Sequence, residues 1–185
     1  MTIDNKENII KTALKLFTQF GVKSITIAKI VQHLHTSKRT IYQHFPDKTQ
    51  LLRTCFDAYV KKIKAENDEI IQTSDNAIEA MAHLLHKILA RRHTINPNFY
   101  MDVVNYYPGL IEEVIHQNGD PATTQMLILS QWGIEDGIFQ KDLDIEVVGN
   151  TVLHLLKLFK DSEKFPIEQY SKERLTFGIL IPYMR

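Results

Sequence analysis

Apolar residues recur at three- and four-residue spacing along most of the chain, which is the pattern of amphipathic helices. In the first such segment, 5–20, one face carries Ile9, Ile10, Ala13, Leu16, Phe17 and Phe20. Gly21 then supplies the residue type that most often ends a helix. The sequence holds no sustained alternation of apolar and polar positions, which would indicate a half-buried strand. The pattern predicts an all-α protein.

Two short helices separated by a tight break follow the first one. The segment 26–34 begins at Thr26, whose hydroxyl suits an N-cap, and it places four apolar residues on one face: Ile27, Ile30, Val31 and Leu34. The segment 37–45 turns Ile41 and Phe45 inward and leaves polar and basic residues outside. The two segments therefore predict a helical hairpin of about twenty residues.

A longer helix is predicted over 47–71, because Asp47 and Gln50 have capping-box spacing. Its buried stripe comprises Leu52, Phe56, Tyr59, Val60 and Ile63. Turn residues separate the later helices, which we expect at 77–92, 99–105, 110–117, 124–134, 145–160 and from about 171. The sequence thus predicts a small lobe of three helices, 1–46, followed by a larger helical lobe, 47–185, with about nine helices.

Charge divides along the chain in the same way. The 185 residues include 22 basic and 22 acidic side chains, so the formal net charge is zero. Residues 1–64 carry twelve basic and four acidic side chains, a balance of +8, whereas residues 65–185 carry ten and eighteen, a balance of −8. The asymmetry favours a polyanion partner for the first third alone. Chance clustering of solvated charge is the alternative.

Composition indicates which kind of protein this is and in which compartment it works. A hydrophobic share of 44% is ordinary for a globular chain, and the apolar run 177–181 is far shorter than a membrane span. The N-terminus carries charged residues and no apolar segment, so we expect no secretory signal. A single cysteine, Cys55, cannot form an internal disulfide and suits a reducing compartment. These features predict a cytoplasmic protein.

The hairpin 26–45 has the shape of a helix-turn-helix, in which the second helix enters the DNA major groove. Its second helix exposes side chains that can read base edges or phosphates: Ser37, Lys38, Arg39, Thr40, Gln43 and His44. Thr26, Tyr42 and Lys48 lie at or near helix starts, where phosphates can be held. Without further information, these residues fit two interpretations equally well: a DNA-binding helix-turn-helix, or a two-helix hairpin whose basic face is only solvated.

The stretch 9–52 resembles the DNA-binding domain of the TetR (tetracycline repressor) family of bacterial transcriptional regulators. The matching residues are Ala13-Leu14-Lys15-Leu16-Phe17 with Gly21, Thr26-Ile27-Ala28-Lys29-Ile30, Ser37-Lys38-Arg39-Thr40-Ile41-Tyr42-Gln43-His44-Phe45, and Lys48 with Leu51-Leu52. Two positions depart from the family. Val31 stands where alanine is usual, and His35 stands where glycine is usual in the turn, a place suited to a left-handed backbone.

The resemblance implies roles for the residues of the hairpin. Thr26, Tyr42 and Lys48 would grip phosphates, His44 would contact base or phosphate, and the remaining set would face bases or nearby phosphates: Ser37, Lys38, Arg39, Thr40 and Gln43. It also implies a three-helix DNA-binding domain followed by a helical ligand-binding and dimerisation domain. We therefore expect a regulator, most simply a repressor, that binds a palindromic operator in double-stranded DNA as a dimer and is released by a small molecule.

The predicted helix 145–160 has more apolar surface than one core face needs. One stripe comprises Ile145, Val148, Val152, Leu155, Leu156 and Phe159, while Val147 and Leu158 lie on a second face. With the last helix, 171–184, it would form an intersubunit four-helix bundle, as in the family. The alternative is a central helix that is fully buried within a monomer.

The resemblance further implies a pocket for an apolar inducer in the larger lobe. Its candidate lining residues are Met81, His83, His86, Tyr100, Met101, Val104, Tyr107, Met126, Trp132 and Phe139. Large apolar residues at helical spacing are equally core residues, which is the alternative for this set. Ligand binding would move the helix 47–71 and change the separation of the two recognition helices.

Other chemistry has little support in the sequence. His83 and His86 have the three-residue spacing of a metal pair, but no third ligand stands out among His93, His116 and His154. Catalytic and phosphate-loop motifs are also missing, so we expect no enzyme, metal or cofactor. The remaining alternatives are a transcriptional activator, a ligand-independent regulator, or a helical protein-interaction module that does not bind DNA.

Overall fold

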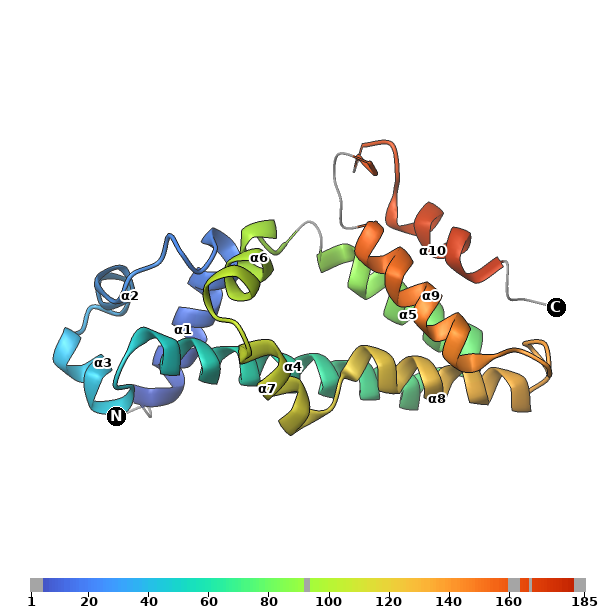
Figure 1. The fold of residues 1–185 in the computed structure, drawn as a ribbon, viewed down its shortest axis with the longest axis horizontal. Coiled ribbons are helices and arrows are strands. Elements are labelled where there is room, and N and C mark those ends of the chain that lie inside the picture. The colour runs from blue at the N-terminus through green and yellow to red at the C-terminus, as the bar shows by residue number, and fades with distance from the viewer. Residues whose placement is uncertain (1–4, 92–93, 160–163, 167, 182–185) are drawn as a thin grey trace. The chain divides into compact units, whose positions relative to one another are not determined.

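Helices account for most of the chain in the computed structural model, which describes residues 5–91, 94–159, 164–166 and 168–181 (Figure 1). Ten helices follow one another over these residues, and the all-α prediction is confirmed; seven of the ten, α4–α10, lie in the segment 47–185, where about nine were expected. Their bounds are α1 Asn5–Phe20, α2 Ile27–Leu34, α3 Lys38–His44, α4 Lys48–Thr73, α5 Ala77–Ala90, α6 Pro97–Tyr106, α7 Leu110–Asn118, α8 Pro121–Glu135, α9 Ile145–Leu158 and α10 Lys172–Leu180.

The helices gather into two compact units. The first unit contains α1, α2, α3, the part of α4 through Lys62, and the segment Thr94–Gly119 with α6 and α7. The second unit contains α4 from Ile63, α5, α8, α9 and α10. The predicted boundary after residue 46 divides the chain differently, because it separates α4, α6 and α7 from α1–α3. That 1–46 forms a domain of its own stays a prediction.

The core of the first unit joins α1, α3, α4 and α6. Its fully buried side chains include Ile9, Ala13, Phe17, Ile41, Phe45, Leu51, Leu52 and Val103. One residue of the expected α1 face lies outside this core, since Phe20 is 47% exposed. Phe20 is the last residue of α1, and the chain turns at Gly21 (φ 81°), so Val22 and Ile25 occupy the buried positions instead.

The core of the second unit joins α5, α8, α9 and α10. Val152, Leu156 and Phe159 of the predicted α9 stripe are buried in it, as are Leu175, Ile179 and Leu180 of α10. The ends of three predicted helices, at Arg92, at Lys160 and over 182–184, lie outside the described residues. Over the residues that are described, no helix combines the length and apolar content needed to cross a bilayer.

Capping residues set most helix starts, and α8 begins three residues earlier than the expected Thr124. Asp120 is its N-cap: one carboxylate oxygen accepts from the Ala122 N–H at 3.1 Å, and the other accepts from the Thr123 hydroxyl at 2.6 Å. Pro121 occupies the first helical position, where its missing N–H costs nothing. The segment 118–123, which lies between two of the predicted helices, thus includes the start of α8.

The loop 137–144 is held to the end of α8 by a glycine. The Ile138 and Phe139 N–H groups both donate to the Gly133 carbonyl oxygen at 2.9 Å. A Cβ atom at Gly133 would lie 2.2 Å from the Phe139 ring, which is itself buried. Any side chain at this position would therefore displace the ring from the core.

Candidate nucleic-acid interface

The first helix of the hairpin, α2, begins as the sequence predicts. Thr26 is its N-cap, and its hydroxyl oxygen accepts from the Lys29 N–H at 3.3 Å. Ile27 and Ile30 are buried, whereas Thr26 and Lys29 are exposed. The Lys29 ammonium donates to the Ser24 carbonyl oxygen at 2.8 Å, which ties α2 to the loop before it.

The turn between α2 and α3 depends on His35. This residue has φ 49° and ψ 44°, and it is the one non-glycine residue with positive φ in the described part of the chain. The predicted left-handed backbone is therefore confirmed. The Thr36 N–H donates to the Val31 carbonyl oxygen at 3.2 Å across the turn, which satisfies the end of α2.

The second helix, α3, turns one apolar residue inward and most of its polar residues outward. Ile41 is buried at its centre. Ser37 is the N-cap, and its hydroxyl oxygen accepts from the Thr40 N–H at 3.1 Å. Thr40 is half-buried, and the other predicted contacts of this helix are exposed: Ser37, Lys38, Arg39, Tyr42, Gln43 and His44. A short helix thus presents two cations, an amide and an imidazole to solvent.

Lys48, the expected phosphate-binding lysine, is engaged within its own unit. Its ammonium donates to the Val22 carbonyl oxygen at 2.6 Å and lies 5.9 Å from the centre of the Phe17 ring. Partial burial lowers the pKa of Lys48, and the nearby negative charge of Asp102 opposes this shift. Lys48 therefore fixes the loop after α1 in this structure, whereas Thr26 and Tyr42 are exposed.

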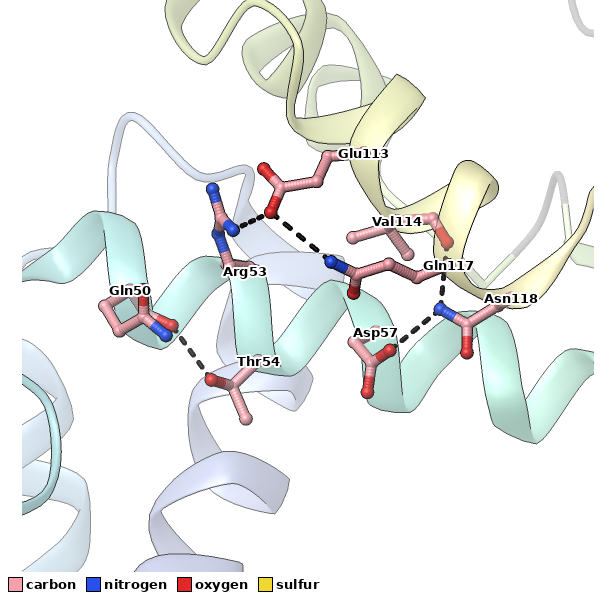
Figure 2. A network of polar contacts seen from close by, with 8 residues as sticks. All are labelled: Gln50, Arg53, Thr54, Asp57, Glu113, Val114, Gln117 and Asn118. Atoms are coloured by element: carbon pink, nitrogen blue, oxygen red, sulfur yellow. Dashed lines mark hydrogen bonds and ion pairs between the residues drawn. The ribbon is translucent and has the colours of Figure 1, made fainter.

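Polar contacts join α4 to α7 in the same unit, as Figure 2 shows. Arg53 forms an ion pair with Glu113. The Asn118 side-chain amide donates to one Asp57 carboxylate oxygen at 2.8 Å. Burial would raise the pKa of Asp57, but hydrogen bonds from Lys61 and Asn118 outweigh it and leave that pKa lowered. The segment 94–119 is thereby attached to the helix that follows the hairpin, which the periodicity of the sequence did not indicate.

The ten residues predicted to line an inducer pocket are divided between the two units. In the second unit Met81, Met126 and Phe139 are buried, Trp132 and His86 are half-buried and His83 is exposed. In the first unit Tyr107 is half-buried, and three residues of α6 are exposed: Tyr100, Met101 and Val104. Tyr107 lines an open depression of about 400 Å³, together with Thr49, Arg53, Tyr106, Pro108, Gly109, Leu110 and Glu113. That the ten residues bind a ligand stays a prediction.

The histidines considered as metal ligands are also separated. His116 lies in the first unit, His154 lies in the second with His83 and His86, and His93 lies outside the described residues. His86 is 3.9 Å from Glu173. The part of the chain that the structure describes holds no group of three or more histidine, cysteine or acidic side chains arranged to bind a metal ion.

Cys55 is fully buried on the core side of α4. Burial raises the pKa of its thiol to about 12, while a backbone hydrogen bond acts weakly in the opposite direction. The thiol is therefore protonated at neutral pH and has none of the thiolate character that a reactive cysteine needs.

Comparison with known proteins agrees with this geometry. Residues 9–55 match the family described as "Bacterial regulatory proteins, tetR family". The chain is 29% identical over 167 residues to the uncharacterized HTH-type transcriptional regulator YhgD of Bacillus subtilis, covering 89% of this chain and 87% of YhgD. It is 20% identical over 147 residues to the HTH-type transcriptional repressor KstR2 of Mycolicibacterium smegmatis, covering 77% and 71%.

Solved structures share the whole fold. A TetR transcription regulator from Haloarcula marismortui superposes with a TM-score of 0.79 at 16% identity, covering 98% of this chain and 99% of that one. FadR from Bacillus subtilis, in complex with stearoyl-CoA, superposes with a TM-score of 0.72 at 16% identity, covering 95% of each chain.

The α2–α3 hairpin is thus the helix-turn-helix of a DNA-binding transcription regulator. Residues 9–55 match the DNA-binding part of the TetR family of bacterial transcriptional regulators, and the chain shares its fold with a solved TetR transcription regulator.

Proposed function

We propose that this protein is a cytoplasmic repressor that binds a palindromic operator as a homodimer and leaves it when a small molecule binds. The observation that carries the proposal is the polar and basic surface of α3 beside a capped α2. Lys38 and Arg39 can donate to guanine, and Gln43 can pair with adenine in the major groove. The name of the relative KstR2 supports repression rather than activation.

Exposed apolar side chains on α9 and α10 support the homodimer. The buried stripe of α9 leaves Val147 59% and Leu158 39% exposed, and the core residues of α10 leave Phe177 61% and Ile181 62% exposed. Apolar side chains on two helices that share one core suit a self-complementary interface of two-fold symmetry. Two such subunits would place two recognition helices on successive major grooves.

The support for a small-molecule effector comes from a solved structure of the same fold. The FadR structure of the same fold holds stearoyl-CoA, and the buried Met81, Met126 and Phe139 of the second unit are apolar. We propose that the effector is apolar and is bound within the second unit, among the predicted residues that lie there. Its binding to this chain would shift the equilibrium between a form that fits DNA and a form that does not.

The test is protection of the DNA upstream of the protein's own gene, followed by affinity measurements on the protected duplex over a series of salt concentrations. We expect a protected palindrome, sequence-selective binding, and an affinity that falls with salt as phosphate contacts release counterions. A panel of fatty acyl compounds, sterols and quaternary amines is then titrated into the complex. Binding to acidic proteins without selectivity for any duplex would contradict the proposal and favour an interaction module.

A further inference from the structure

The start of α6 is bonded to the end of α1, the helix that precedes the DNA-binding hairpin. The Asn96 N–H donates to the Thr18 carbonyl oxygen at 2.8 Å, and its side-chain amide donates to the Gln19 carbonyl oxygen at 3.3 Å. Both carbonyl groups belong to the last turn of α1, where carbonyl oxygens find no N–H donor within their own helix. The Asn96 side-chain oxygen also accepts from the Asn98 N–H at 2.9 Å, so one side chain closes α1 and starts α6.

One turn further along α6, Asp102 holds the loop between α1 and α2. A carboxylate oxygen of Asp102 accepts from the Lys23 backbone N–H at 2.7 Å. A Cβ atom at Gly21 would lie 3.0 Å from the same oxygen and 3.2 Å from the Cβ of Asn98. Gly21 has φ 81°, so glycine serves both the turn and the close approach of α6. The loop held in this way ends at Thr26, the N-cap of α2.

Two lysines belong to the same junction. The Lys23 ammonium donates to the Tyr106 hydroxyl at 2.9 Å, one turn beyond Asp102 on α6. The Lys48 ammonium donates to the Val22 carbonyl oxygen at 2.6 Å, and Lys48 also lies within the electrostatic reach of Asp102. The Asp102 carboxylate therefore does two things. It accepts a hydrogen bond from the Lys23 amide, and its charge acts on Lys48, which binds the neighbouring Val22.

We propose that Asp102 is a positioning residue for DNA binding, which fixes the loop 21–26 and Lys48 so that Thr26 and the α2–α3 hairpin are presented in one orientation. The inference rests on the proposed function. In this proposal α6 acts on the loop that leads into the helix-turn-helix through a direct contact. This contact is additional to the packing of α6 against α4.

Electrostatics alone gives the opposite expectation for this residue. A carboxylate near a DNA-binding surface repels phosphates, so removing its charge tightens DNA binding if the carboxylate has no other role. If Asp102 instead orders the hairpin, removing it weakens binding, because the hairpin must be ordered when DNA binds. The sign of the change in affinity thus separates the two explanations.

The experiment compares Asp102→Ala with Glu112→Ala in the full-length chain, on the duplex that the wild-type protein protects. Glu112 is an exposed carboxylate on α7 of the same unit, so both variants lose one negative charge. We expect Asp102→Ala to bind about tenfold more weakly, the size expected for loss of one charge-assisted hydrogen bond. Glu112→Ala should bind as well as the wild type or slightly better. Asp102→Asn keeps an acceptor oxygen and should fall between wild type and Asp102→Ala.

Two further measurements separate positioning from general damage. Circular dichroism identifies a temperature at which all variants are folded, and binding is measured there. The slope of log affinity against log salt should become shallower by about one if a misplaced Lys48 no longer reaches a phosphate, whereas a lost contact of the uncharged Thr26 hydroxyl should lower affinity with little change in slope. Should Asp102→Ala fail to fold, Asp102→Asn carries the same test with a smaller effect.

Outcomes divide clearly between the two proposals. If the wild-type protein protects no DNA, the proposed function fails. If the wild-type protein binds and both alanine variants bind equally well or more tightly, the proposed function stands and the role of Asp102 is overturned. Faster hydrogen exchange of the Lys23 amide in Asp102→Ala, measured without DNA, is the expected sign that the loop has been released; unchanged exchange would also count against the proposal.

Discussion

The exposed surface of α3 differs in chemistry from the exposed surfaces of α9 and α10, although each of the three helices buries apolar residues in a core. On α3 the outward residues are Lys38, Arg39, Gln43 and His44 beside one exposed tyrosine, Tyr42. α9, α10 and the residue after α10 expose four large apolar side chains among their polar ones: Val147, Leu158, Phe177 and Ile181. Charged donors suit phosphates and base edges, whereas apolar side chains suit a protein surface. The first unit therefore suits a nucleic-acid partner and the second unit a protein partner. Substitutions on either surface can test this difference.

The largest effect is expected on α3. Replacing both Lys38 and Arg39 by alanine removes two cations from the proposed major-groove contact, so operator affinity should fall by at least about a hundredfold. Filter binding or fluorescence anisotropy at fixed salt measures the change. Lys141→Ala removes one cation from an exposed loop of the second unit, outside the unit that contains α3, and should leave affinity within about twofold. If both variants lost operator affinity equally, the surface of α3 would have no special role in DNA binding.

The next effect concerns the apolar surface of α10. Phe177→Asp places a charge at a residue that is 61% exposed in the subunit, so the fold of the subunit should survive. If Phe177 lies in the dimer interface, burying an unpaired carboxylate should weaken dimerisation by about 2–4 kcal/mol. Analytical ultracentrifugation at micromolar concentration should then find a monomer. Ile128→Asp alters a residue of α8 that is 48% exposed, and it should leave the dimer intact. A monomeric wild-type protein would refute the interface altogether.

A smaller effect is expected inside the second unit, where a glycine is required by packing. Gly133→Ala forces its new methyl group against the Phe139 ring and should lower the free energy of unfolding by about 1–3 kcal/mol. Gly149 lies within α9, and a Cβ there would meet only the Met126 side chain at 3.9 Å. Gly149→Ala should therefore raise stability by about 0.5–1 kcal/mol. Chemical denaturation compares the two variants, and a stabilising Gly133→Ala would disprove the packing explanation.

The smallest effect concerns the turn of the hairpin in the first unit. His35→Gly relieves a left-handed backbone at a non-glycine residue and should raise stability by about 1 kcal/mol. His33 lies in the last turn of α2 with an ordinary helical backbone, so His33→Gly should lower stability by about the same amount. Thermal unfolding of the two variants gives the sign directly. Lower stability of His35→Gly would show that the imidazole makes a contact worth more than the backbone strain.

Local rules in the sequence were sufficient for the helix-turn-helix. Thr26 and Ser37 cap α2 and α3 through their own hydroxyls, and His35 adopts the left-handed turn expected at its position. Each of these features depends on residues within four positions of one another, so periodicity and capping chemistry can identify them. The same rules placed the start of α8 three residues late, because Asp120-Pro121 was interpreted as a loop when it is a cap followed by the first helical residue.

Contacts between distant segments could not be found in this way. The bond between Lys23 and Asp102 spans 79 residues, and the ion pair between Arg53 and Glu113 spans 60. In the sequence these carboxylates lie on solvent-facing positions of short helices, with nothing to indicate a partner. The predicted inducer residues show the same limit, since spacing along a helix does not separate a buried Met81 from an exposed Met101.

The sequence by itself determined the helices, their caps and the basic helix-turn-helix hairpin, because these depend on local hydrogen bonding and on a 3.6-residue period. The tertiary structure alone decided that α6 and α7 belong with that hairpin, that Lys48 binds a loop carbonyl, and that Asp102 faces the Lys23 amide. Such pairings follow from how the chain folds back on itself. Their free energy comes from groups far apart in sequence, which no local pattern records.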